Sequence, residues 1–178
     1  ISLGMEMYRN DNRGNFPYWI SNLYPNYINT KKVYQCPADG NRGKNENEWE
    51  QRLGSTKDFS SAYDRPQNAG VSSESKPSSV GGVSYFYEMS DAACEWTLPG
   101  FESSNSPFSW TELKEYQLKY GIAGGYDPTL FPVVRCFWHA HKKKGEELND
   151  NSRPALNIAY AGNFFMSYFE WERGQWSP

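Results

Sequence analysis

Apolar residues recur at helical spacing at the start of the chain, and a polar stretch follows them. The apolar positions are Ile1, Leu3, Met5 and Tyr8, and the glycine-containing stretch 12–15 is a typical helix stop. No residue of the N-cap type precedes Ile1. We therefore expect residues 1–13 to be the end of a helix that begins upstream of this chain, with a signal or membrane segment before it.

The pattern of the second half predicts strands. Residues 83–89 alternate aromatic and polar positions, which is the period of a half-buried strand. Residues 131–138 are almost continuously apolar, which predicts a central strand buried on both faces. In residues 155–171, Gly162-Asn163 lies between two aromatic-rich runs, and this predicts a hairpin with a tight two-residue turn.

One further helix has a clear start signal. Ser109 precedes Glu112 by three residues, as in a capping box, and Gly121 follows the last helical position. Residues 41–82 and 139–153 are polar and predict long irregular loops. The chain of 178 residues is thus expected to form a single α+β domain, in which an N-terminal helix packs on a small antiparallel sheet.

Composition narrows the possible functions. Aromatic residues make up 17% of the chain while aliphatic residues are sparse, so the core should consist largely of rings. The net charge of −3 argues against nucleic acid as a partner, because phosphate binding needs clustered cations. The basic run Lys142–Lys144 is interpreted as a solvated loop. No nucleophile, phosphate-loop or dinucleotide motif occurs, so we expect no catalytic activity.

Cysteines and histidines offer the few candidates for a metal or a disulfide. Cys36, Cys94 and Cys136 lack the paired spacing of a zinc ribbon. One disulfide plus one thiol is possible, with Cys36–Cys136 the favoured pairing of three, and three buried thiols are the alternative. His139 and His141 would share one face of a strand and could bind a metal, although the sequence offers no evident third ligand.

Several segments resemble bacterial prepilin-type proteins, the group of type II secretion pseudopilins. Residues 8–17 read Tyr-Arg-Asn-Asp-Asn-Arg-Gly-Asn-Phe-Pro, which is similar to the Tyr-x-x-Asp-Asn-x-Gly-x-Phe-Pro signature that follows the hydrophobic helix of that group. Tyr34-Gln-Cys36-Pro37-Ala-Asp39 resembles its Cys-Pro turn, and 84–87 its aromatic strand. At the C-terminal hairpin the chain has Ala161-Gly162-Asn163 where relatives commonly have Ala-Asp-Gly-His.

The resemblance implies a type IV pilin-like fold and a role in assembly. Such proteins anchor in the inner membrane through an N-terminal helix and then polymerise through it, because a heterologous contact repeats without closing. Ile1, Leu3, Met5 and Tyr8 would be the remaining stub of this helix, and the prepilin peptidase site would lie upstream. The implied location is the periplasm or cell surface, and the implied partners are other pilin-like subunits and secretion-system components.

The resemblance also suggests one possible cofactor, because better-known major pseudopilins hold calcium in a loop near the end of the sheet. Here the oxygen ligands could come from a set of acidic and amide residues, namely Asp127, Glu146, Glu147, Asn149 and Asp150. Calcium needs six to eight such oxygens. No other cofactor is expected.

A secreted or membrane-anchored carbohydrate-binding module is the alternative function. Exposed aromatic rings bind sugars by stacking, and Trp49 and Trp96 lie in or beside polar loops. Two coplanar exposed rings would favour glycan binding, and buried rings would favour the filament subunit.

Overall fold

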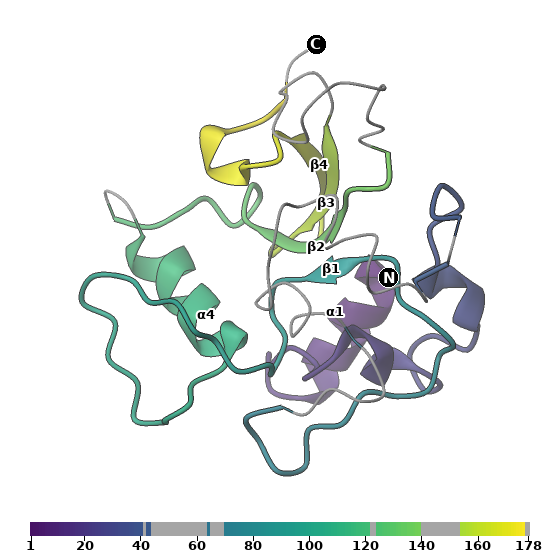
Figure 1. Ribbon diagram of the computed structural model, residues 1–178, viewed down its shortest axis with the longest axis horizontal. Coiled ribbons are helices and arrows are strands. Elements are labelled where there is room, and N and C mark those ends of the chain that lie inside the picture. The colour runs from purple at the N-terminus through teal and green to yellow at the C-terminus, as the bar shows by residue number, and fades with distance from the viewer. Residues whose placement is uncertain (41, 44–63, 65–69, 122–123, 140–153, 177–178) are drawn as a thin grey trace.

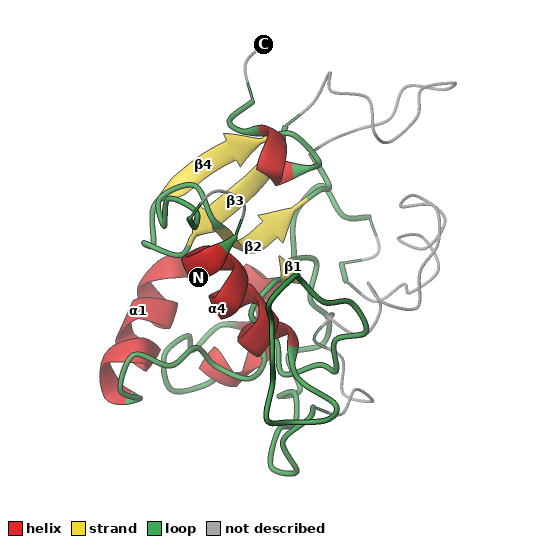
Figure 2. Cartoon of the chain, turned by 90° about the vertical axis from the view of Figure 1, so that its left-hand side faces the viewer, coloured by secondary structure: helices red, strands yellow, loops and turns green. Residues whose placement is uncertain are grey.

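The protein is an α+β domain, and in the part of the chain that the structure describes two α-helices lie beside one antiparallel sheet (Figures 1 and 2). The computed structural model describes residues 1–40, 42–43, 64, 70–121, 124–139 and 154–176. The helices are α1 (Ser2–Asp11) and α4 (Trp110–Tyr120), and three short 3-10 helices are η1 (Ile20–Leu23), η2 (Lys31–Tyr34) and η3 (Trp171–Arg173). The strands are β1 (Phe86–Tyr87), β2 (Pro132–Cys136), β3 (Ala155–Ala159) and β4 (Phe164–Ser167), in spatial order β1-β2-β3-β4.

Helix α1 ends where the sequence predicts. The amide of Gly14 donates to the carbonyl of Arg9 at 2.7 Å, and Gly14 has φ +88°, a conformation that costs glycine little. Two side chains of α1 contact the connection between β3 and β4. Ser2 Oγ donates a hydrogen bond to the carbonyl of Gly162 at 2.6 Å, and Arg9 Nη1 donates one to the carbonyl of Tyr160 at 3.2 Å. The N-terminal helix is therefore attached to the sheet through the hairpin turn.

Strand β2 occupies the centre of the sheet, as its apolar run predicts. All five of its residues are buried, and it pairs with β1 on one side and β3 on the other. The prediction of a strand over 83–89 is wrong in extent, since β1 covers two residues. Ser84 bonds elsewhere: its amide donates to the carbonyl of Tyr34 and its carbonyl accepts from Trp138 Nε1. The expected alternation is also absent, because Ser84 and Glu88 are buried.

The predicted C-terminal hairpin is confirmed, but the prediction of a two-residue turn is wrong. The pairing runs from Ala155 opposite Ser167 to Ile158 opposite Phe164. The amide of Ala159 also donates to the carbonyl of Asn163 at 2.8 Å, so three residues connect the last bonded pair. Gly162 has φ +86°, as a three-residue hairpin loop with a left-handed residue requires.

The start of α4 is the predicted capping box. Ser109 Oγ accepts from the amide of Glu112 at 3.2 Å, and the Glu112 carboxylate accepts from the amide of Ser109 at 2.8 Å. Two donors that a helix start leaves without partners are thus satisfied.

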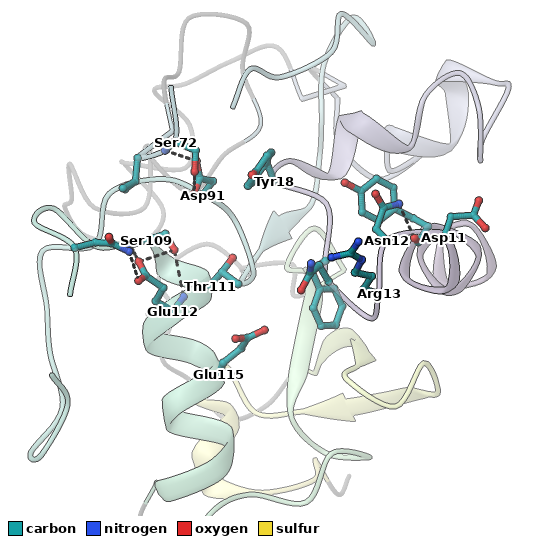
Figure 3. A pocket seen from close by; sticks show the side chains of 15 residues that line it. Asp11, Asn12, Arg13, Tyr18, Ser72, Asp91, Ser109, Thr111, Glu112 and Glu115 are labelled. Carbon is teal, nitrogen blue, oxygen red and sulfur yellow. Dashed lines mark hydrogen bonds between the residues drawn. The ribbon is translucent and has the colours of Figure 1, made fainter. Parts of the chain in front are cut away.

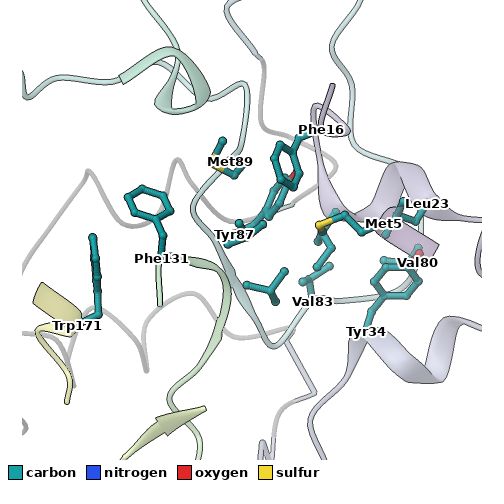
Figure 4. Packing of buried hydrophobic residues seen from close by; sticks show 13 residues of the cluster. Met5, Phe16, Leu23, Tyr34, Val80, Val83, Tyr87, Met89, Phe131 and Trp171 are labelled. Atoms are coloured by element: carbon teal, nitrogen blue, oxygen red, sulfur yellow. The ribbon is translucent and has the colours of Figure 1, made fainter. Parts of the chain in front are cut away.

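Aromatic rings make up much of the core, as the composition predicts. Fully buried rings include Trp19, Tyr34, Phe86, Tyr87 and Phe131. In Figure 4 the Met5 side chain reaches from α1 toward Tyr87 of β1, and both belong to one buried cluster with Phe131 and Trp171. Because such rings bury 150–250 Å² each, few of them suffice for this core.

Buried polar contacts attach the long loop to this core. The carboxylate of Asp64 accepts hydrogen bonds from the amide and the hydroxyl of Ser21, and Trp19 Nε1 donates to Ser75 Oγ at 2.8 Å. Burial raises the pKa of Asp64 to about 7, and the Ser21 hydrogen bonds oppose this shift.

The raised pKa of Asp64 predicts that stability falls as pH rises. Between its ordinary value of 3.8 and about 7 the folded chain keeps a proton that the unfolded chain has released. The free energy of unfolding of the wild type should therefore drop, relative to Asp64→Asn, by a few kcal/mol from pH ~4 to pH ~8, at about 1.4 kcal/mol per pKa unit. Urea titrations of both proteins measure this difference, and parallel pH profiles would contradict it.

Candidate functional site

Helix α1 has apolar residues on two sides. Met5 is 3% exposed and lies in the core, whereas Leu3 is 75% and Met7 46% exposed. The expectation that Ile1, Leu3, Met5 and Tyr8 form one face is thus wrong for Leu3. At 100° per residue Leu3 lies about 200° around the helix from Ile1 and close to Met7. Ile1 and Tyr8 are half-buried on the core side.

The exposed side of α1 continues into neighbouring apolar surface. A groove of about 390 Å³ runs along Ile1, Leu3 and Met7, and residues 25–29 and Val33 form its other wall. Gly4 allows this packing, since a Cβ there would lie 2.7 Å from Ile28 Cγ1. We call Leu3, Met7 and Val33 the outer apolar surface.

A second candidate site is a pocket of about 570 Å³ between α4 and the sheet, which we call the aromatic pocket. Its walls are mainly rings and include Phe86, Trp96, Trp110, Phe169 and Trp171. Three buried polar side chains also line it, Glu88, Lys114 and Arg135. Gln117 completes the lining, and its Oε1 is buried without a hydrogen-bond partner among the described residues.

The polar groups of the aromatic pocket form an ion-pair network. Glu88 Oε2 lies 3.0 Å from Lys114 Nζ, and Glu88 Oε1 lies 3.4 Å from Arg135 Nη1. Arg135 also donates to Asn157 Oδ1 at 3.1 Å and to the carbonyl of Phe169 at 2.6 Å. Burial lowers the pKa of Arg135, and the Glu88 carboxylate opposes this shift. Lys114 Nζ lies 5.2–5.9 Å from the ring centroids of Trp96, Trp110, Phe131 and Trp171.

The tryptophans that the structure describes do not form the flat platform that glycan stacking would favour. Trp49 lies outside the described residues, and Trp96 is half-buried with its ring at 76° to that of Trp110. Trp19, Trp110, Trp138 and Trp171 are buried, and Trp176 is half-buried. Among the described tryptophans, Trp96 of the aromatic pocket is thus the ring best placed to contact a ligand.

Two cysteines and one histidine meet near the end of β2. Cys136 Sγ lies 3.6 Å from Cys36 Sγ, and Cys36 Sγ lies 3.3 Å from His139 Nε2. The three ligand atoms all lie within 4.8 Å of one another. A pocket of about 320 Å³ opens beside them, and Tyr85, Leu156 and Phe164 are among its walls. We call Cys36, Cys136 and His139 the thiol–imidazole cluster.

Burial governs the electrostatics of this cluster. It raises the pKa of Cys136 to about 12, and the neighbouring Cys36 adds to the shift. Burial also raises the pKa of Tyr85 to about 12, with Cys136 and Cys36 contributing. The predicted Cys36–Cys136 disulfide stays a prediction: both residues are thiols in this structure and lie side by side. Cys94 is buried elsewhere, with its Sγ 3.4 Å from the carbonyl of Trp96.

Of the other predicted metal ligands, the structure describes Asp127, which is not part of this cluster. His141, Asp150, Glu146, Glu147 and Asn149 lie outside the described residues. Asp127 is described, and its carboxylate accepts from the amide and the hydroxyl of Thr129, which lowers the pKa of Asp127. Among the described residues, the thiol–imidazole cluster is the group of His, Cys, Asp and Glu side chains that lies within metal-binding reach.

A wide polar cleft of about 610 Å³ separates the end of α1 from the start of α4 (Figure 3). Asp11, Asp91, Glu112 and Glu115 give it an acidic lining. Three of these carboxylates accept hydrogen bonds from the protein: Asp91 from Ser72, Glu112 from Ser109 and Asp11 from the hydroxyl of Tyr27. Burial raises the pKa of Glu115. These hydrogen bonds hold neighbouring segments of the protein together and do not identify a ligand for the cleft.

Sequence reasoning missed the ion-pair network. Arg135 interrupts the apolar run of β2, and a charged residue in a strand expected to be buried on both faces signals a buried partner. Glu88 was placed on the polar side of an alternating strand, and Lys114 lies in the predicted helix without any signal of burial. No pattern in the sequence pairs these residues.

Comparisons of the chain with protein-family models, curated proteins and solved structures find no match. Within the part of the chain that the structure describes, none of the helices combines the length and apolar character that crossing a bilayer requires.

Removal of the Glu88 charge should destabilise the fold strongly. Glu88→Gln would leave two buried cations without a counter-ion, which typically costs 3–5 kcal/mol, roughly. The free energy of unfolding from urea titration measures the loss. The matched control is Glu102→Gln on an exposed loop, expected within about 0.5 kcal/mol of wild type. Equal effects of the two substitutions would show that the network contributes no net stability.

Proposed function

We propose that this chain is the head of a non-enzymatic, pilin-like subunit that assembles through its N-terminal helix. The observation that carries the proposal is the outer apolar surface, on which Leu3 and Met7 of α1 face solvent while Met5 faces the core. A helix with two apolar sides buries one against its own domain and has the other available for a second protein.

The geometry supports a helical partner on this surface. The groove beside Leu3 and Met7 is lined by apolar side chains together with Asn26 and Asn29, and Gly4 lets residues 27–28 lie close to the helix axis. Small residues at a helix surface allow close packing, and side chains spaced at i and i+4 align along the helix. A second copy of the same helix would present a matching Leu3–Met7 stripe.

The resemblance of residues 8–17 and 34–39 to prepilin-type proteins supports the same proposal from the sequence. Under this proposal the full-length protein is anchored in the inner membrane before assembly and works in the periplasm or at the cell surface. Its partners are other pilin-like subunits and components of a secretion system. Its contribution is repeated contact between subunits, and the head covers the outside of the filament.

Photo-crosslinking of the full-length protein in bacterial membranes tests the proposal. A photo-reactive phenylalanine analogue in place of Met7 should give a ladder of multimers upon illumination, because the outer apolar surface would face a neighbouring subunit. The same analogue at Tyr120, 55% exposed on α4, is the matched control. Gel analysis and mass spectrometry of the products read out the result.

Two outcomes of this experiment decide between the alternatives. A ladder from position 7 that Leu3→Ser abolishes supports assembly through α1. Monomers from both positions contradict it and direct attention to a binding function of the head.

A small-molecule site in the aromatic pocket is the second candidate function. Its volume of about 570 Å³ falls within the range of ligand sites, roughly 300–1,000 Å³, and half-buried rings, Trp96 among them, form part of its wall. The unpartnered Gln117 Oε1 would accept a hydrogen bond from a hydroxyl group. These features favour a glycan unit that stacks on Trp96.

Titration with bacterial oligosaccharides tests this second candidate. Binding monitored by tryptophan fluorescence should weaken by at least about tenfold in Trp96→Ala, an effect of about 1.4 kcal/mol. Tyr120→Ala removes an exposed ring of α4 outside the pocket and should leave affinity unchanged. Absence of binding to a broad glycan panel, or equal affinity of both variants, would exclude the pocket as the glycan site.

A further inference from the structure

The thiol–imidazole cluster combines residues from two distant parts of the chain. Cys36 begins the turn that follows η2, where the amide of Asp39 donates to the carbonyl of Cys36 at 3.0 Å. Cys136 is the last residue of β2, and His139 follows three positions later. Cys36 and Cys136 are separated by 100 residues in the sequence, so the fold itself creates the cluster.

The two separations from Cys36 Sγ are close to those of a tetrahedral metal site. Zinc bonds of about 2.3 Å to sulfur and about 2.0 Å to nitrogen place two sulfur ligands about 3.8 Å apart, and a sulfur and a nitrogen about 3.5 Å apart. Cys36 Sγ lies 3.6 Å from Cys136 Sγ and 3.3 Å from His139 Nε2, and all three ligand atoms lie within 4.8 Å of one another. From this agreement we propose that Cys36 Sγ, Cys136 Sγ and His139 Nε2 bind one divalent cation of the zinc class.

The chemistry of the three ligands selects this class of cation. Thiolate sulfur and imidazole nitrogen suit zinc, whereas calcium and magnesium require oxygen ligands. Two thiolates balance the charge of one divalent ion, so the loaded site is neutral in its buried surroundings. Lys and Arg are absent from the described residues that line the adjacent pocket.

The surroundings leave a fourth coordination position available. Cys36 and Cys136 are buried, while His139 is exposed, so the ion reaches the sulfurs from the histidine side. The adjoining pocket of about 320 Å³ has room for a water molecule or a small ligand on the ion. Three protein ligands with one open position are the arrangement of accessible zinc sites.

Metal binding and a Cys36–Cys136 disulfide exclude each other because they use the same two sulfur atoms. The proposal therefore concerns the protein with reduced thiols. It does not depend on the assembly function, because none of its three ligands belongs to the outer apolar surface, although Ile1 and Val33 line both this pocket and the groove along Leu3 and Met7.

Titration with Co²⁺ tests the site in the full chain. The protein is reduced with a phosphine that does not bind metals, and its three thiols are counted before Co²⁺ is added. We expect one equivalent of Co²⁺ to produce a thiolate-to-cobalt charge-transfer band, and Zn²⁺ to displace it. Thermal unfolding with and without Zn²⁺ should show an increase in Tm that grows with Zn²⁺ concentration.

Two variants and one control make the test specific. Cys136→Ser should abolish the charge-transfer band, and His139→Ala should weaken Co²⁺ binding by more than about tenfold, since even outer-shell substitutions cost 10–100-fold, roughly. Cys94→Ser removes the remaining cysteine, which lies against Trp96, and should leave binding unchanged. Because His139 is exposed, its substitution tests the site without disturbing the core.

The proposal is overturned if the fully reduced wild type gives no charge-transfer band. It is also overturned if the band persists in Cys136→Ser, if His139→Ala binds Co²⁺ as tightly as the wild type, or if the band disappears in a folded Cys94→Ser, because the ion would then bind elsewhere.

Discussion

The placement of α4 on the sheet depends on one buried carboxylate, Glu88, and its two cations. Lys114 contributes from α4 and Arg135 from β2, while Asn157 of β3 and the carbonyl of Phe169 bond to Arg135. Charges removed from water are expensive unless each has a partner, so the network tolerates no arrangement that separates these segments. The helix, the centre of the sheet and the chain after β4 are thereby held together.

Polar contacts between distant segments also shape two surfaces of the molecule. The ion-pair network links α4 to β2 through Glu88, and the rings around Lys114 line a pocket there. On the other side of the domain, hydrogen bonds from Ser2 and Arg9 to the β3–β4 connection orient α1 so that Met5 is inside and Leu3 outside. The outer apolar surface is thus suited to contact with a helix, and the aromatic pocket to a small polar ligand. Both functions proposed for these surfaces therefore concern binding.

Elements with local signals could be predicted from the sequence. The capping box of Ser109 and Glu112 and the hairpin around Gly162 are determined by residues a few positions apart, so their prediction needed no knowledge of the fold. The extent of β1 could not be predicted, because Ser84 bonds to Tyr34 and Trp138, which are distant in sequence. The face of Leu3 could have been assigned from helical spacing, and the error there was to place Leu3 on the same face as Ile1, Met5 and Tyr8.

By itself, the sequence determined an α+β domain with an aromatic core, a helix that ends before Gly14 and a buried central strand, because hydrophobic period and capping chemistry are local properties. Only the tertiary structure decided that Glu88, Lys114 and Arg135 share one buried site and that Cys36, Cys136 and His139 meet. These groups come together only when β2 is paired and the segment after η2 packs beside its end. Contacts between residues some 100 positions apart have no sequence period and arise from packing alone.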